Sequence, residues 1–104
     1  MDSIKKEVKG EVCVITLNRP QAFNSFNREM ALAFQEALDA ANHDKLVRAI
    51  VIRGEGKAFC AGQDLKEVTS PELNPGFKKI LDEHYGPIVK KIRTTAKPII
   101  SKAI

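Results

Sequence analysis

The amino-acid sequence predicts an α/β fold, in which helices cover a β-sheet, and three features lead to this prediction. The first is a pair of β-type runs, 5–9 and 12–17, that a two-residue turn at 10–11 separates. The second is an apolar stripe with helical spacing that begins after Asn27, and the third is a β-branched run over 49–53. Strands and helices that follow one another in this way are typical of layered α/β structure.

The N-terminal runs predict a β-hairpin. Residues 5–9 alternate weakly between polar and apolar side chains, whereas Val12–Leu17 is strongly apolar and β-branched. Gly10 lies between them and tolerates the backbone angles of a tight turn. Pro20, which cannot donate to a strand ladder, is expected to end the second strand together with the two residues before it.

The first helix is expected from Asn27 to about residue 42. Its apolar positions recur every three or four residues and form one face: Met30, Phe34, Ala37, Leu38 and Ala41. Asn27 is a good N-cap, and Glu29 lies in the first turn, where negative charge suits the helix dipole. Residues 42–44 are expected to end the helix.

The rest of the chain predicts a strand, two helical stretches and a last strand. The 49–53 run reads as a buried strand that the Gly-Glu-Gly sequence of 54–56 stops. A helix start at 70–72 is soon interrupted, and an apolar helical stripe over 77–92 should kink or break at Gly86-Pro87. Residues 98–104 read as the final strand, so the predicted order is ββαβααβ.

Composition excludes several classes of protein. The chain has 104 residues, 43% hydrophobic and 29% charged, with a net charge of +4, which is ordinary for one globular unit over 1–104. Its six aromatic residues do not interleave with its basic ones, which argues against nucleic acid as a partner. No apolar run has the length of a membrane span, and the N-terminus lacks a signal-peptide core, so we expect a cytoplasmic protein. Cys13 and Cys60 fit no metal-ligand spacing, so we expect buried free thiols and no metal site.

The loop over 57–65, directly after the third predicted strand, carries the strongest functional signal. Its small residues leave backbone N–H groups uncovered, and such a loop can hold an anionic oxygen close to the main chain. It could equally be a tight connection between a strand and a helix. It is not a dinucleotide fingerprint, because Phe59 stands where the third glycine is needed, and Ala58 after Gly56-Lys57 excludes a P-loop.

Three motifs in order resemble the enoyl-CoA hydratase/isomerase (crotonase) family. Lys57-Ala-Phe-Cys-Ala-Gly-Gln-Asp-Leu65 resembles its oxyanion loop, and 14–20 with 22–24 resembles its opening strand and first acyl-CoA-binding turn. Ala96-Lys-Pro-Ile-Ile100 resembles the strand before its second oxyanion loop. The resemblance implies the N-terminal part of a crotonase-like ββα superhelix, with the C-terminal part absent from this chain.

The resemblance also implies site residues. The main-chain N–H of Gln63 is the implied catalytic group, one of two donors of an oxyanion hole, and the other donor is expected beyond Ile104. The positions implied to bind substrate and CoA are Ala22, Phe23, Ala61, Gly62, Gln63, Asp64 and Leu65. At Gln21 the family often has Lys or Arg facing a CoA phosphate, a charge that Gln cannot supply.

Other polar residues allow more than one role. Asp64 could act as a general base or could cap the helix after the loop, and capping is the usual role of such a residue. His43 is expected at a helix end and His84 on an apolar stripe, which are structural positions for histidine. The lysine pairs at 5–6, 78–79 and 90–91 are expected on solvated faces, although CoA phosphates could engage some of them.

The resemblance therefore predicts an acyl-CoA hydratase or isomerase of fatty acid metabolism, a lyase-type enzyme that stabilises a thioester enolate. This chain would carry half of the site and would be inactive alone. No separate cofactor is expected, since coenzyme A enters as part of the substrate. The full-length family implies a homo-oligomer, a trimer or hexamer. The alternative is a non-catalytic CoA-binding or assembly fragment.

Overall fold

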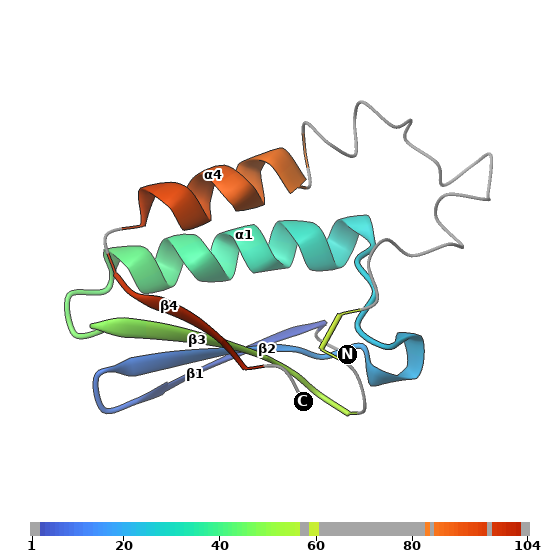
Figure 1. The fold of residues 1–104 in the computed structure, drawn as a ribbon, viewed down its shortest axis with the longest axis horizontal. Coiled ribbons are helices and arrows are strands. Elements are labelled where there is room, and N and C mark those ends of the chain that lie inside the picture. Colours follow the sequence, from blue (N-terminus) through green and yellow to red (C-terminus); the bar gives the residue numbers. More distant parts are fainter. Residues whose placement is uncertain (1–2, 57–58, 61–82, 84, 96, 103–104) are drawn as a thin grey trace.

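A computed structural model describes residues 3–56, 59–60, 83, 85–95 and 97–102 (Figure 1). Its elements follow the predicted order. They are β1 (Ile4–Lys9), β2 (Val12–Leu17), the 3₁₀ turn η1 (Pro20–Ala22), α1 (Arg28–His43), β3 (Ala49–Gly54), α4 (Gly86–Thr94) and β4 (Ile99–Lys102). The helix start expected at 70–72 and the stripe over 77–82 lie outside the described residues.

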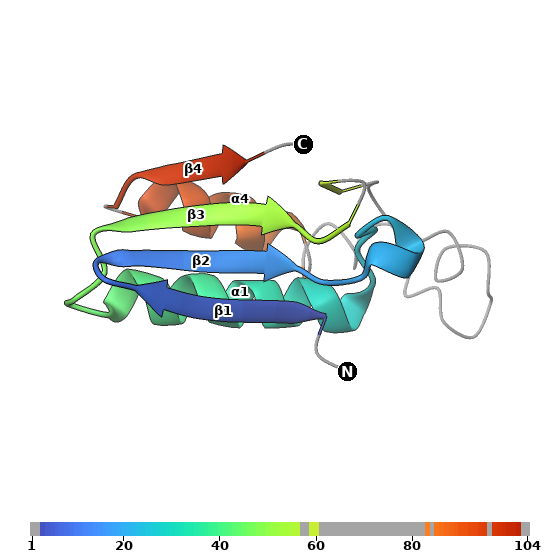
Figure 2. The same cartoon turned by 90° about the horizontal axis from the view of Figure 1, so that it is seen from below.

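The four strands form one mixed sheet in the order β1-β2-β3-β4. β1 and β2 make the predicted antiparallel hairpin, whose turn contains Gly10 with a φ of 62°. β2, β3 and β4 run parallel to one another. Both helices lie on the same face of this sheet, α1 behind β1 and β2 and α4 behind β3 and β4 (Figure 2).

The core lies between that face and the helices. Along β2 and β3 the side chains that point toward the helices are buried: Cys13, Ile15, Leu17, Ile50 and Ile52. α1 contributes the five predicted apolar residues and also Ala31, all buried. The expectation of a buried strand over 49–53 is confirmed for Ile50 and Ile52 and is wrong for the other three residues. Ala49, Val51 and Arg53 are only half-buried, because they face the side of the sheet away from both helices.

Both ends of α1 are fixed by side chains. The Asn27 Oδ1 accepts a hydrogen bond from the Met30 N–H (2.9 Å), which confirms the predicted N-cap. At the other end the Lys97 ammonium, which follows α4, donates to the carbonyl oxygens of Ala41 (2.7 Å) and Asp44. A cation there satisfies carbonyls that have no partner within the helix and complements the helix dipole. His43 also lies in this last turn, and its Nδ1–H donates to the Asp39 carbonyl (2.8 Å).

α4 begins at Gly86, and Pro87 occupies its first turn, where a missing N–H costs no helical hydrogen bond. The predicted kink or break at Gly86-Pro87 falls at the start of α4, directly after the π-helical residues Glu83 and Tyr85. Two ion pairs join α4 and the residues before it to α1. The Lys91 Nζ lies 2.8 Å from the Asp39 carboxylate, and the Arg28 Nη2 lies 3.0 Å from Glu83 Oε1.

The two cysteines differ in burial. Both thiols are free, and Cys13 is fully buried as expected. Cys60 is only half-buried, so the expectation of a buried thiol is wrong there. The reason is its position in the segment that leaves β3, where it packs against the margin of the core rather than inside it.

Candidate functional site

Three strand ends meet at one edge of the sheet. In the parallel register Leu17 at the end of β2 pairs with Gly54 at the end of β3. Arg53 pairs in turn with Lys102, the last residue of β4. Ligands of open α/β sheets bind outside the carboxyl ends of parallel strands, so this edge is the place to look for a site.

The first segment at this edge is the turn over 18–25, which contains the predicted acyl-CoA-binding turn at 22–24. Main-chain hydrogen bonds close it, from the Ala22 N–H to the Arg19 carbonyl (2.9 Å) and from the Phe23 N–H to the Pro20 carbonyl (3.1 Å). Phe23 and Asn24 both have left-handed backbones, with φ values of 52° and 57°. Non-glycine residues seldom adopt such angles, and strained backbone of this kind clusters at functional sites.

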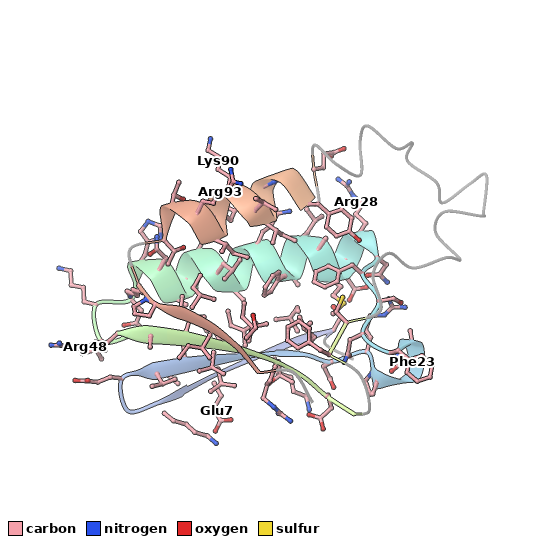
Figure 3. The ribbon with its side chains drawn as sticks, in the orientation of Figure 1. Glu7, Phe23, Arg28, Arg48, Lys90 and Arg93 are labelled. Atoms are coloured by element: carbon pink, nitrogen blue, oxygen red, sulfur yellow. The ribbon has the colours of Figure 1, made fainter. Side chains whose placement is uncertain are left out.

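Phe23 projects from this turn. Its side chain is 55% exposed, although it is a large aromatic residue. Figure 3 shows it at one end of the molecule, opposite the end that carries Arg48. Ala22 is half-buried at the end of η1. The two predicted CoA-binding residues of the turn therefore lie at the edge where the parallel strands end.

Asn24 is a residue of this site that sequence reasoning missed as a contributor. Its side chain is fully buried, and its Oδ1 accepts from the Arg19 N–H (2.7 Å). Its Nδ2 donates to the carbonyl oxygen of Glu55, 31 positions later (2.9 Å). The side chain thus ties the first turn to the residue that follows β3. The available signal was the Asn itself, since Asn is among the residues that adopt a left-handed backbone most readily.

The exit of β3 also contacts the turn directly. Gly56 has a φ of 85°, and a Cβ atom on it would lie 2.9 Å from the Cβ of Pro20. The Glu55 N–H donates to the Leu17 carbonyl (2.9 Å), and the Glu55 carboxylate pairs with Arg53 (3.5 Å). The segment that enters the 57–65 loop is therefore fixed against the 18–25 turn.

The remaining predicted site residues lie outside the described residues: Ala61, Gly62, Gln63, Asp64 and Leu65. His84 lies outside them as well. The structure describes the two segments that precede this loop, namely the 18–25 turn and β3, which leads into the loop.

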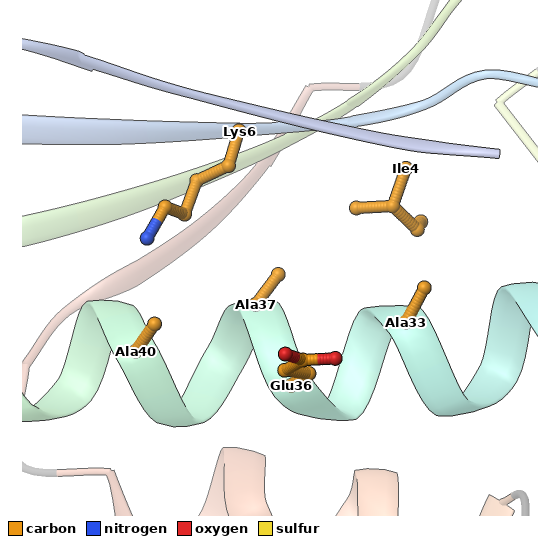
Figure 4. A pocket seen from close by; sticks show the side chains of 6 residues that line it. All are labelled: Ile4, Lys6, Ala33, Glu36, Ala37 and Ala40. Atoms are coloured by element: carbon orange, nitrogen blue, oxygen red, sulfur yellow. The ribbon is translucent and has the colours of Figure 1, made fainter. Parts of the chain in front are cut away.

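The structure also has a hollow apart from the 18–25 turn. A hollow of about 230 Å³ lies between β1 and α1, lined by Ile4, Lys6, Ala33, Glu36, Ala37 and Ala40 (Figure 4). It contains none of the predicted site residues. In the described part of the chain no group of three acidic, His or Cys side chains could hold a metal ion. Neither α1 nor α4, the helices that the structure describes, has the length and apolar character needed to cross a bilayer.

Comparison with known proteins connects this frame to a family. Residues 7–103 match the family model for enoyl-CoA hydratase/isomerase. The chain is 36% identical over 104 residues to 1,2-epoxyphenylacetyl-CoA isomerase of Escherichia coli, an alignment that covers 96% of this chain and 39% of the relative. The chain thus spans about two fifths of the length of such curated relatives.

Solved structures agree in fold. An enoyl-CoA hydratase of Mycobacterium smegmatis superposes with a TM-score of 0.88 at 33% identity, covering 97% of this chain and 39% of that one. An enoyl-CoA hydratase/isomerase (crotonase) of Legionella pneumophila superposes with a TM-score of 0.86 at 28% identity, covering 99% and 40%. The architecture is the N-terminal part of the crotonase fold, and the chain belongs to the enoyl-CoA hydratase/isomerase family.

Proposed function

We propose that this chain binds a CoA thioester and supplies one half of an oxyanion hole that stabilises the enolate of the acyl group, as part of an acyl-CoA hydratase or isomerase. The observation that carries the proposal is the parallel pairing of β3 with β4. β3 leads into the 57–65 loop, and β4 ends at the same edge of the sheet. Neighbouring strands lie about 4.7–4.9 Å apart, so loops that follow them can direct two N–H groups at one oxygen.

In this proposal the main-chain N–H of Gln63 is the first donor. The second donor belongs to a loop after β4, beyond Ile104. The enolate oxygen carries negative charge only as the reaction proceeds, and donors fixed in advance stabilise it without reorganising. Ala22, Phe23 and the main chain of 61–65 hold the CoA part. Coenzyme A enters with the substrate, so the proposal includes no separate cofactor.

Isothermal titration of the purified chain with CoA and with a short enoyl-CoA tests the binding half of the proposal. Saturable binding of both compounds is expected. Failure of both to bind would favour the alternative, an assembly fragment without a CoA site. Turnover, followed by the loss of enoyl-thioester absorbance, is expected to be absent, because removing one oxyanion donor alone costs about 10²–10³ in rate.

Infrared difference spectra of a bound enoyl-CoA, labelled with ¹³C at the thioester carbonyl, test the donor. Hydrogen bonding to Gln63 should lower the carbonyl stretching frequency on binding. Gln63→Ala keeps the main-chain N–H and should keep the shift, whereas Gln63→Pro deletes that N–H and should lose it. Circular dichroism confirms that both variants fold. Loss of the shift in Gln63→Ala would assign the donor to the side chain and refute the main-chain role.

A further inference from the structure

We infer that Asn24 is a positioning residue of the CoA-thioester site: its side-chain amide holds the turn that carries Phe23 in register with the exit of β3. This inference rests on the proposed function, since it concerns how two parts of that site are aligned. The inference goes beyond the proposed function because it assigns a role to Asn24, a buried residue that acts through Phe23 and Glu55 and not by contact with a ligand.

The two contacts require a side chain that accepts one hydrogen bond and donates another. The Arg19 backbone nitrogen can only donate, and the Glu55 carbonyl oxygen can only accept. Asn24 meets both demands, with Oδ1 at 2.7 Å from the first and Nδ2 at 2.9 Å from the second. Its side chain is fully buried, so water cannot replace either partner without opening the turn.

The hydrogen bond between Asn24 and Glu55 is not needed to close the turn. Main-chain bonds already close the turn, including one from the Asn24 N–H to the Arg19 carbonyl (2.8 Å). The bond to Glu55 instead spans 31 positions and joins two segments that follow different strands. Its effect is therefore on the placement of the turn relative to Glu55, at the exit of β3.

The position of the turn affects ligand binding through Phe23, whose ring the turn carries. It immediately precedes Asn24, shares its left-handed backbone and exposes 55% of its side chain. Among the described residues, Phe23 belongs neither to the buried core nor to the hydrophobic side chains packed against it. Fixing Asn24 fixes the direction in which the Phe23 ring leaves the turn.

Two substitutions separate the contacts of Asn24. Asn24→Asp keeps the acceptor for the Arg19 N–H and tolerates the left-handed backbone, but it replaces the donor to Glu55 by an oxygen. Asn24→Gly keeps only the backbone freedom. Lys97→Met is a control, because it also removes side-chain bonds to carbonyls, here partly buried ones at the C-terminal end of α1.

Two readouts are used on the full 104-residue chain. The first is the ¹⁹F spectrum of para-fluorophenylalanine placed at position 23, which reports ring placement without any ligand. The second is the dissociation constant for CoA from isothermal titration. For Asn24→Asp we expect a displaced or broadened fluorine resonance and binding weakened about tenfold, the effect of one lost hydrogen bond. Asn24→Gly should show the same changes, and Lys97→Met should show neither.

An unchanged fluorine resonance in both Asn24 variants would overturn the inference, and so would a changed resonance with CoA affinity equal to that of the wild-type chain. Equal losses of affinity in Lys97→Met would overturn it as well, since they would trace the effect to stability alone. If the wild-type chain binds no CoA, the proposed function fails. The fluorine spectra then still decide whether Asn24 places the Phe23 ring.

Discussion

Gly56 lies against the ring of Pro20 so closely that a Cβ atom on Gly56 would be 2.9 Å from the Pro20 Cβ. Two segments that follow different parallel strands therefore meet at the expected ligand edge with only the Pro20 ring between their backbones. Gly56 also has a φ of 85°, an angle that L-residues with a side chain rarely adopt. Position 56 thus combines a steric and a conformational requirement for glycine.

Gly56→Ala is expected to lower the free energy of unfolding by about 2–3 kcal/mol, since backbone strain and crowding of Pro20 add. Urea denaturation measures the change. Gly10→Ala is the matched control, because Gly10 also has a positive φ, 62°, but open space around its Cα. It should cost about 1 kcal/mol from strain alone. Equal costs at the two positions would show that the Pro20 contact contributes nothing.

Lys97→Met should destabilise the chain by about 1.5–3 kcal/mol, the range for hydrogen bonds that involve a charged group. The variant leaves the carbonyl oxygens of Ala41 and Asp44 without their ammonium donor. Thermal unfolding followed by circular dichroism gives the effect. The control is Lys90→Met on the exposed side of α4 (Figure 3), which should change stability by about 0.5 kcal/mol or less. A Lys97→Met variant as stable as this control would contradict the capping role.

The elements that sequence reasoning placed correctly depend on local patterns. The hairpin and α1 follow from period-two and helical spacing within 4–43, and the Asn27 cap follows from its own neighbours. The contact of Asn24 with Glu55 and that of Lys97 with α1 were not predicted, because they join residues 31 and more than 50 positions apart. A lysine before Pro98 in an apolar stretch was the only local signal for the second of them. The partial exposure of β3 was not predicted, because it depends on whether helices cover one face of the sheet or both. That is a property of the whole sheet and not of the sequence of one strand.

The stability of the chain should fall at alkaline pH because of Cys13. Burial raises the pKa of its thiol from the usual 9.0, and the nearby Lys6 ammonium opposes this only in part. Between 9.0 and the raised value the unfolded chain loses a proton that the folded chain keeps. The free energy of unfolding therefore decreases there by about 1.4 kcal/mol per pH unit, and this thiol has no effect on its pH dependence below that range.

Urea denaturation from pH 7 to pH 11 measures this effect as the difference between the wild-type chain and Cys13→Ala. The subtraction removes contributions that the two chains share. The difference should be constant up to about pH 9 and should then shift against the wild-type chain. A difference that stays constant throughout would contradict ionisation of a buried thiol.

The outer side of β4, the outermost strand of the sheet, should promote self-association. Within the part of the chain that the structure describes, β4 pairs only with β3, and Ile100 is 55% exposed. Exposed edges with apolar side chains pair with other chains. Sedimentation velocity at rising concentration should show oligomers, and Ile100→Lys should reduce them. Leu46→Lys, at an exposed residue outside the strands, should not. A wild-type chain that stays monomeric at high concentration would contradict this expectation and weaken the homo-oligomer that the family resemblance implies.

Phe23→Gly should separate stability from binding. The left-handed backbone at Phe23 costs about 1–2 kcal/mol for a residue with a side chain, and glycine removes that strain. Because the Phe23 side chain is 55% exposed, little packing is lost in return, so the variant should be as stable as the wild-type chain or more stable. Its affinity for CoA should nevertheless fall, by about tenfold, if the ring contacts the ligand. Leu46→Gly, which removes another exposed apolar side chain, should leave the affinity unchanged. A Phe23→Gly variant that binds CoA as tightly as the wild-type chain would remove Phe23 from the site, and the strain at this turn would then need a structural explanation.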